Sequence, residues 1–259
     1  MNGKRMRSIL FLNLTKRFHD SSMEHSDMFE KQVWTIALIE SLHLASLIHD
    51  DIIDDNPSRR GVDSCQKILG RKFSVLFSDY IFAHTSKKFL RIHRGNQFIQ
   101  NIFLKECSST ALGAVLEQGL TLESSIKECL RVASLKTSSF FKLSCFMGSY
   151  LSTNNFQLSL KAATFGTCFG IIYQIQNDLD CYKFKDSSES EDYIQQNITL
   201  PVLILNNSLR FNAFNVRETP QIHYEKIQEK LSSREFKVVL ESLIGKYIEI
   251  IDAFLESML

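Results

Sequence analysis

The sequence contains few of the residues that interrupt helices. Its 259 residues include 10 glycines and 3 prolines. Because both residues are unfavourable inside helices, their scarcity favours long, uninterrupted helices. No segment alternates polar and apolar residues for long, so the sequence requires no β-sheet. With neither an internal repeat nor a Pro/Gly-rich linker, we predict an all-α fold and a single domain over residues 1–259.

A charge excess of one sign is also missing, since 30 Lys and Arg face 29 Asp and Glu, a net +1. Proteins that bind nucleic acid normally carry a basic excess, so we exclude nucleic acid as a partner. Hydrophobic residues at 44% and charged residues at 23% are typical of a globular chain and exclude disorder as its main state. The six cysteines form no CxxC pair, which argues against a zinc site and favours buried thiols in a reducing compartment.

Long apolar runs are absent as well. No run approaches the roughly 20 residues that a membrane-spanning helix needs. The start of the chain, MNGKRMRS, is basic, but Asn13, Lys16 and Arg17 interrupt the apolar stretch behind it, unlike a secretory signal. We therefore expect a cytoplasmic protein without a membrane span.

Apolar residues recur at helical spacing along most of the chain. Residues 33–48 are apolar on most sides, which predicts a buried helix, and Pro57 is expected to end it. The same spacing predicts further helices over residues 73–89, 101–120, 124–151, 156–179 and 234–259.

An acidic cluster follows the apolar helix, in the segment HDDIIDDNPSRRG at residues 49–61. Its carboxylates lie where the helix dipole is already negative, so charge there is unfavourable unless a cation binds. Asp50 and Asp54 share one helix face, and Asp51 and Asp55 repeat that spacing. Such a pair is typical of a Mg²⁺ site that substrate phosphate completes. The alternative is a solvated acidic helix end. That alternative does not explain why a predominantly apolar helix runs directly into the cluster.

Two arginines, Arg59 and Arg60, follow the acidic cluster within a few residues. Guanidinium groups recognise phosphate through paired hydrogen bonds. Carboxylates for a metal and arginines for a phosphate therefore occur in one short segment.

Taken in order, six segments resemble the trans-isoprenyl diphosphate synthases, the polyprenyl synthetase family, of the long-chain, octaprenyl-like type. Six ordered elements between residue 3 and about residue 205 are far more specific than any one of them. They are GKRMRS at residues 3–8 (family GKRxRP), ESLHLASLIHDD at 40–51, DDxxD with RRG at 50–61, SLKTSSFF with Lys136 and Thr137, FGTCFGIIYQIQNDLD at 165–180, and TLP at 199–201.

The resemblance implies a fold, a cofactor and two substrates. The fold is an isoprenoid synthase-type bundle of mostly antiparallel helices around a central cavity, with two acidic motifs facing each other across its mouth. The cofactor is Mg²⁺, and the substrates are isopentenyl diphosphate and an allylic diphosphate. A homodimer, or a heteromer with another synthase subunit, is the family expectation, and the product could still be delivered to a membrane.

The resemblance also assigns roles to individual residues. The allylic diphosphate would bind through Mg²⁺ to the first motif, with Arg59 and Lys136 on its phosphates, while Thr137 and Gln174 steady the cation and the phosphates. Out of context, Lys4 and Arg7 would be an ordinary basic terminus, and His43 could equally be a core histidine. The metal ligands are Asp50, Asp51, Asp54 and Asp178, with Asp180 possible, and the isopentenyl diphosphate ligands are Lys4, Arg7, His43 and Arg60.

The chain departs from the family pattern in its second aspartate-rich motif. Asn177 and Cys181 stand where the family has the first and last aspartates, and Asn197 replaces the lysine before TLP. A neutral amide is a weaker Mg²⁺ ligand than a carboxylate. The helix that usually precedes GKR is also missing from this sequence.

Three functions remain open. The leading one is a Mg²⁺-dependent prenyltransferase that makes a long-chain polyprenyl diphosphate, since the small residues Ala45 and Ser46, about one turn before Asp50, leave room for a growing chain. The second is a non-catalytic or weakly active subunit of a heteromeric synthase, which the damaged second motif motivates. The third is a terpene cyclase, against which the predicted isopentenyl diphosphate ligands speak.

Overall fold

The computed structural model describes residues 4–18, 26–59, 61–182, 198–209 and 220–258. The chain divides into two compact units. Unit 1 comprises Met1–Ser108 and Phe140–Gly166, and unit 2 comprises Ser109–Ser139 and Thr167–Leu259. The single domain over residues 1–259 stays a prediction.

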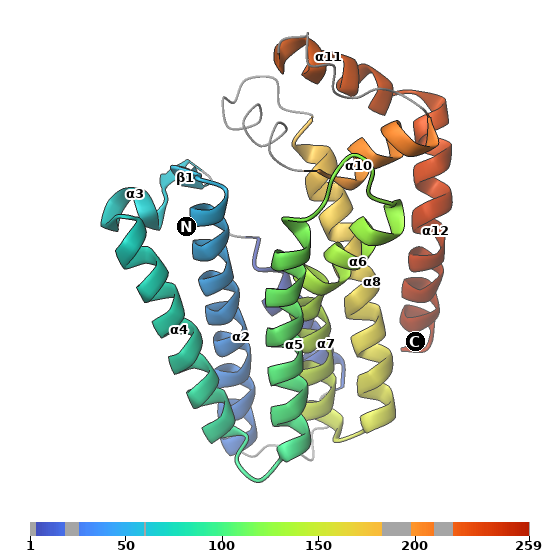
Figure 1. Cartoon of the computed structure of the whole chain (residues 1–259). Helices are drawn as coiled ribbons and strands as arrows, with labels where there is room; N and C mark the ends of the chain where they lie inside the picture. Colours follow the sequence, from blue (N-terminus) through green and yellow to red (C-terminus); the bar gives the residue numbers. More distant parts are fainter. Residues whose placement is uncertain (1–3, 19–25, 60, 183–197, 210–219, 259) are drawn as a thin grey trace. The chain divides into compact units, whose positions relative to one another are not determined.

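Helices dominate the described residues, and strands are limited there to one two-residue pair (Figure 1). The elements are α1 (Met6–Arg17), α2 (Ser26–Ile53), β1 (Ser58–Arg59), β2 (Val62–Asp63), α3 (Cys65–Leu69), α4 (Arg71–Ile92), α5 (Gln97–Glu117), α6 (Ile126–Lys136), α7 (Ser138–Thr153), α8 (Phe156–Asp180), α10 (Leu200–Leu203), the π-helix η2 (Ile204–Ser208), α11 (Pro220–Leu231) and α12 (Arg234–Glu256).

The all-α prediction is confirmed, and most predicted helices match within a few residues. One prediction is wrong: residues 124–151 form two helices, α6 and α7, with Thr137 between them. At this break Thr137 bonds to Gln174, and Ser138 lies against Gly170. Tertiary contacts therefore override the continuous helical pattern of the sequence.

The core of unit 1 lies between α1, α2, α4, α5 and α7. Its apolar positions on α2 recur at helical spacing, at Ile36, Ile39 and Leu42, as the sequence pattern predicts. Phe89 and Phe103 stack within it, with ring centroids 3.8 Å apart. Burying each aromatic side chain contributes roughly 1.5–3 kcal/mol, so this core holds α2 firmly behind the acidic cluster.

Helix α4 lies alongside α2 in unit 1 (Figure 1). The side of α4 that is buried carries small polar residues, and Ser78 donates a hydrogen bond to the backbone carbonyl of Ala45 at 2.7 Å. Ala45 itself is buried. The small residues on both helices explain how α4 can pack against α2 near the end that carries the acidic cluster.

The core of unit 2 gathers α6, α8, α10, η2, α11 and α12 around buried aliphatic and aromatic side chains. Helix α6 begins with a capping box, in which Ser125 and Glu128 satisfy each other's backbone amides. The short α10 and η2 are almost fully buried from Leu200 to Leu205. This buried segment fixes the position of Thr199 and Leu200 beside the end of α8.

Among the described residues, no helix has the length and apolar character needed to span a membrane.

Candidate functional site

The acidic cluster of unit 1 lies at the C-terminal end of α2. Asp50 and Asp51 belong to its last turn, and Asp54 and Asp55 follow directly. The backbone N–H of Asn56 donates to the carbonyl of Asp51 at 2.9 Å, a bond that closes the helix end. Asp55 adopts a left-handed conformation with φ 53°, in the place where glycine is usual. The chain therefore turns sharply and leaves the carboxylates at the helix end.

A small hairpin then returns Arg59 to this cluster. Strands β1 and β2 pair in antiparallel fashion across Gly61, whose φ of 72° favours glycine. The Nε of Arg59 donates to Oδ1 of Asp51 at 2.7 Å. Burial raises the pKa of Asp51, and the charge and hydrogen bond of Arg59 oppose that rise. The predicted metal ligand and the predicted phosphate ligand are thus joined as an ion pair; Arg60 lies outside the described residues.

The N-terminal basic segment attaches to α2 and α7. Arg5 and Ser8 both contact the carboxylate of Glu40, at 3.6 Å and 2.6 Å. Arg7 is buried, and its guanidinium lies 4.4 Å from the centre of the Phe141 ring. Among the predicted isopentenyl diphosphate ligands, Arg7 is therefore built into the packing of unit 1, while Lys4 is exposed.

His43 lies about two turns before Asp50 on α2 and is half-buried. Its Nδ1 is 3.5 Å from the hydroxyl of Ser46, which also donates to the His43 carbonyl at 2.8 Å. The histidine is therefore neither deeply enclosed nor fully exposed, and its role in binding isopentenyl diphosphate stays a prediction.

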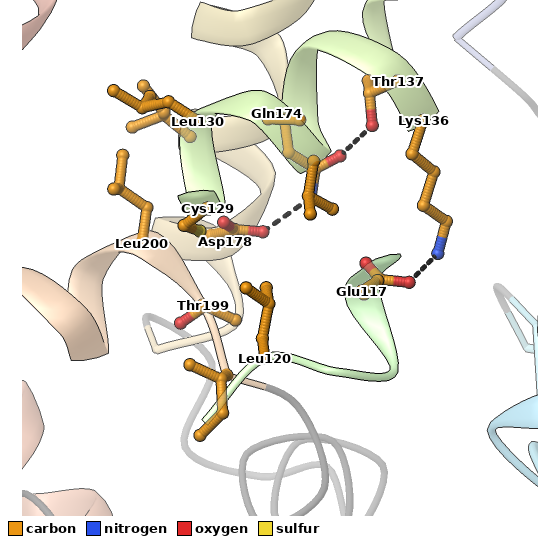
Figure 2. A pocket seen from close by; sticks show the side chains of 14 residues that line it. Glu117, Leu120, Cys129, Leu130, Lys136, Thr137, Gln174, Asp178, Thr199 and Leu200 are labelled. Atoms are coloured by element: carbon orange, nitrogen blue, oxygen red, sulfur yellow. Dashed lines mark hydrogen bonds and ion pairs between the residues drawn. The ribbon is translucent and has the colours of Figure 1, made fainter. Parts of the chain in front are cut away.

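Four of the residues that the sequence predicted in unit 2, Lys136, Thr137, Gln174 and Asp178, line one pocket (Figure 2). Thr137 donates to Oε1 of Gln174 at 2.6 Å, and Nε2 of Gln174 donates to Oδ1 of Asp178 at 2.7 Å. Lys136 forms an ion pair with Glu117 at the end of α5. A short chain of hydrogen bonds therefore links the break after α6 to the second aspartate-rich segment on α8.

Two glycines allow the helices of this pocket to approach each other closely. A Cβ atom on Gly113 of α5 would lie 2.4 Å from the backbone nitrogen of Lys136. A Cβ on Gly170 of α8 would lie 2.6 Å from Cα of Ser138. Both distances are too short for real contacts, so the positions of Lys136 and Thr137 depend on these glycines.

Asp178 is enclosed by the pocket and 5% exposed. Burial is the main reason why its pKa rises to about 7; hydrogen bonds from Gln174 and the Leu200 backbone oppose the rise, and the Glu117 charge adds to it. The TLP segment thus contacts the pocket carboxylate directly, because Leu200, the first residue of α10, donates its backbone N–H to Asp178. A carboxylate held in this way is half neutral near pH 7.

Asp180, the other carboxylate of the second motif, does not line the pocket, and it accepts a hydrogen bond from Nε2 of Gln176 at 2.7 Å. Cys181 donates to the carbonyl of Asn177 at 3.3 Å, and burial raises its pKa to about 11, so it remains a thiol. Asn197 lies outside the described residues. Within the described part of the chain, no three His, Cys, Asp or Glu side chains gather as a ready metal site.

Two residues beside the predicted site carried no signal in the sequence. Glu117 pairs with Lys136, although nothing in its surroundings marked it as functional. Gln66, in α3, donates both N–H groups of its carboxamide to backbone carbonyls at the end of α2, those of Asp51 and Asn56. Only the folded arrangement brings these partners together.

The polyprenyl synthetase family model matches residues 1–230, so the chain belongs to the polyprenyl synthetase family. The chain is 29% identical to a prenyl transferase of Porphyra purpurea over 78% of its own length and 62% of that protein's. It is 27% identical to heptaprenyl diphosphate synthase component 2 of Bacillus subtilis, over 90% and 67% of the two lengths. The decaprenyl-diphosphate synthase of Dictyostelium discoideum is 29% identical over 92% of this chain and 48% of its own length.

Solved structures confirm the isoprenoid synthase-type fold. A decaprenyl diphosphate synthase from Rhodobacter capsulatus superposes with a TM-score of 0.80 at 22% identity, covering 98% of this chain and 80% of that one. A polyprenyl synthase from Caulobacter crescentus, complexed with calcium and isoprenyl diphosphate, gives the same TM-score and identity over 99% and 79%. The chain spans 62% of the length of its Porphyra relative and about half that of the Dictyostelium one.

Proposed function

We propose that this protein is a trans-prenyltransferase that condenses isopentenyl diphosphate with an allylic diphosphate to a long-chain polyprenyl diphosphate. Membership of the family supports the reaction class, and the heptaprenyl and decaprenyl names of its relatives support a long product. The observation that carries the proposal is the end of α2, where Asp50, Asp51 and Asp54 stand beside Arg59. Carboxylates for a cation and a guanidinium for a phosphate are combined there in one short segment.

The donor set at the end of α2 fits Mg²⁺. Mg²⁺ prefers carboxylate oxygens and usually takes only one or two of them, completing its shell with water and substrate phosphate. Asp50 and Asp54 are half-buried and four residues apart, so both carboxylates can reach one ion. When bound, Mg²⁺ would neutralise the negative charge that develops on a departing pyrophosphate.

In the proposed reaction the allylic C–O bond breaks, and its electron pair leaves with pyrophosphate. The double bond of isopentenyl diphosphate supplies the electrons for the new C–C bond, and the departing pyrophosphate takes the proton that is lost. Arg59 and Lys136 would hold the phosphates of the allylic substrate by charge-assisted hydrogen bonds. The carbonyl oxygen of Gln174 and the hydroxyl of Thr137 would lie near the developing cation, as the family resemblance implies.

A second candidate function has its own support. The carboxylate of Asp178 is enclosed, and its neighbours in the motif are Asn177 and Cys181. Two relatives carry the names heptaprenyl diphosphate synthase component 2 and decaprenyl-diphosphate synthase subunit 1. The chain could therefore act as one subunit of a heteromeric synthase, whose partner supplies the second half of the site. A homodimer remains the other assembly that we expect.

A product assay on the purified chain tests both functions. It contains Mg²⁺, farnesyl diphosphate and labelled isopentenyl diphosphate, and Asp51→Ala serves as the control. Label in an extended prenyl chain, lost in the variant, establishes a synthase that acts alone, and the product length is read directly. No turnover by a chain whose circular dichroism is that of a folded helical protein contradicts the stand-alone enzyme and favours the subunit.

A further inference from the structure

Gln66 occupies an unusual position behind the acidic cluster. It is the second residue of α3 and is half-buried. Its Nε2 donates to the backbone carbonyl of Asp51 at 2.7 Å and to that of Asn56 at 2.9 Å. A carboxamide has two N–H donors, so Gln66 uses both of them on the segment 51–56, which contains the end of α2.

These bonds act on the part of the backbone that sets the direction of the carboxylates. The carbonyl of Asp51 also accepts the N–H of Asn56, so both of its lone pairs are used. Asp54 lies between the two carbonyls that Gln66 holds. The Cα–Cβ directions of Asp51 and Asp54 therefore depend on a segment that Gln66 ties at both ends.

The turn that follows α2 is less favourable than a glycine turn. Asp55 holds a left-handed conformation, which aspartate adopts more readily than most residues but less readily than glycine. Asp51 must also keep its hydrogen bond to Arg59, which arrives on the adjacent hairpin. Without Gln66 the helix end could unwind by a turn and separate the carboxylates from Arg59.

We infer that Gln66 is a positioning residue for the metal- and phosphate-binding end of α2. The inference rests on the proposed function, because it assumes that this end binds Mg²⁺ and diphosphate. Loss of a residue that orients a metal ligand typically lowers metal affinity on the order of 10–100-fold. Removing the carboxamide should therefore weaken Mg²⁺-dependent diphosphate binding while leaving the fold intact.

The chain offers a matched control in Gln100 of α5. Its carboxamide also donates to two backbone carbonyls at a helix end, those of Leu90 and His93 at 2.9 and 3.3 Å, and it is also half-buried. Gln66→Met and Gln100→Met remove the same chemistry from two places in unit 1. Only the first should change the binding of a ligand at the acidic cluster.

Equilibrium dialysis with labelled inorganic pyrophosphate, at increasing Mg²⁺ concentration, measures that binding without catalysis. We expect Gln66→Met to raise the Mg²⁺ concentration for half-maximal binding about 10-fold or more, with Gln100→Met like wild type and Asp51→Asn without binding. Unchanged binding in Gln66→Met, with binding lost in Asp51→Asn, overturns the role of Gln66 and leaves the proposed function standing. Equal binding by wild type and Asp51→Asn overturns both.

Thermal unfolding of each variant precedes the dialysis. Should Gln66→Met fail to fold, Gln66→Asn replaces it, because asparagine keeps the carboxamide but is one methylene too short to reach both carbonyls. A weakened Mg²⁺ dependence in Gln66→Asn supports the inference in the same way, and wild-type dependence overturns it.

Discussion

In unit 1 the candidate carboxylates stand at a helix end, whereas in unit 2 the corresponding carboxylate lies inside a pocket. Asp51 is paired with Arg59, and Asp50 and Asp54 beside it are half-buried. Asp178 is surrounded by Gln174, the amide of Leu200 and apolar side chains, and its pKa rises to about 7. The acidic cluster of unit 1 thus offers the carboxylates that we propose bind a cation, whereas the pocket of unit 2 encloses a carboxyl group that is easily neutral.

The difference extends to the basic residues of each half. Arg59 reaches the carboxylate of a predicted metal ligand, so the predicted metal and phosphate ligands are adjacent in unit 1. Lys136 is instead paired with Glu117, which is not part of either aspartate-rich motif. In unit 2 the altered second motif therefore lies beside a local network of hydrogen bonds that joins Thr137, Gln174 and Asp178.

We expect the largest loss of activity from a substitution in the acidic cluster of unit 1. Asp51→Ala removes a predicted Mg²⁺ ligand and the partner of Arg59, so kcat/KM for isopentenyl diphosphate should fall roughly 10²–10³-fold. Asp180→Ala, in the unit 2 half, should change it by less than about 2-fold, because the Asp180 carboxylate already bonds to Gln176. Steady-state kinetics of both variants checks this; comparable losses would show that the second motif also binds metal.

Asp178→Asn tests whether the Asp178 carboxyl group in the pocket of unit 2 is readily protonated. The folded-state pKa of about 7 exceeds the ordinary 3.8, so the native protein binds the proton more tightly than the unfolded chain. Wild type should therefore lose stability as pH rises from about 4 to 7. Since one pKa unit corresponds to about 1.4 kcal/mol, the contribution of Asp178 falls by about 2–3 kcal/mol between pH 5 and pH 8.

Urea unfolding of wild type and Asp178→Asn at both pH values measures this difference. The free energy of unfolding of Asp178→Asn, relative to that of wild type, should rise by that amount between pH 5 and pH 8. A constant difference between the two proteins would contradict an enclosed, readily neutralised Asp178.

Gly113→Ala tests whether the unit 2 pocket depends on close helix approach. The new methyl group would meet the backbone of Lys136, which cannot move like a flexible side chain, so the free energy of unfolding should fall by about 1–3 kcal/mol. Gly119→Ala is the control, since its nearest neighbour lies at an ordinary 3.5 Å. Chemical denaturation compares the two, and equal stabilities would argue against the close approach.

The smallest effect concerns the ion pair of Lys136. Both side chains are about a quarter exposed, so solvent screens the pair, and Glu117→Gln should cost about 1 kcal/mol or less. A double-mutant cycle with Lys136→Met isolates the coupling between the two residues. A coupling well above that value would mean that the pair contributes more to unit 2 than its exposure implies.

The sequence predicted the parts of the structure that repeat locally. Helical spacing placed α4, α5, α8 and α12 within a few residues, but α2 (Ser26–Ile53) extends beyond the predicted 33–48 at both ends. Thr137, Gln174 and Asp178, which the resemblance named, line one pocket, and their roles stay predictions. The break at Thr137 was missed, because it depends on contacts with α8 rather than on local pattern. Gln66 and Glu117 were missed for the same reason, since their partners lie 15 and 19 residues away along the chain.

The most direct test of the difference between the two halves is calorimetric titration of Mg²⁺ with pyrophosphate into wild type, Asp51→Asn and Asp178→Asn. Both substitutions remove one carboxylate and keep its shape. We expect Asp51→Asn to lose Mg²⁺-dependent binding and Asp178→Asn to retain the wild-type affinity within about 3-fold. Loss of binding in Asp178→Asn, with binding kept in Asp51→Asn, would contradict this expectation.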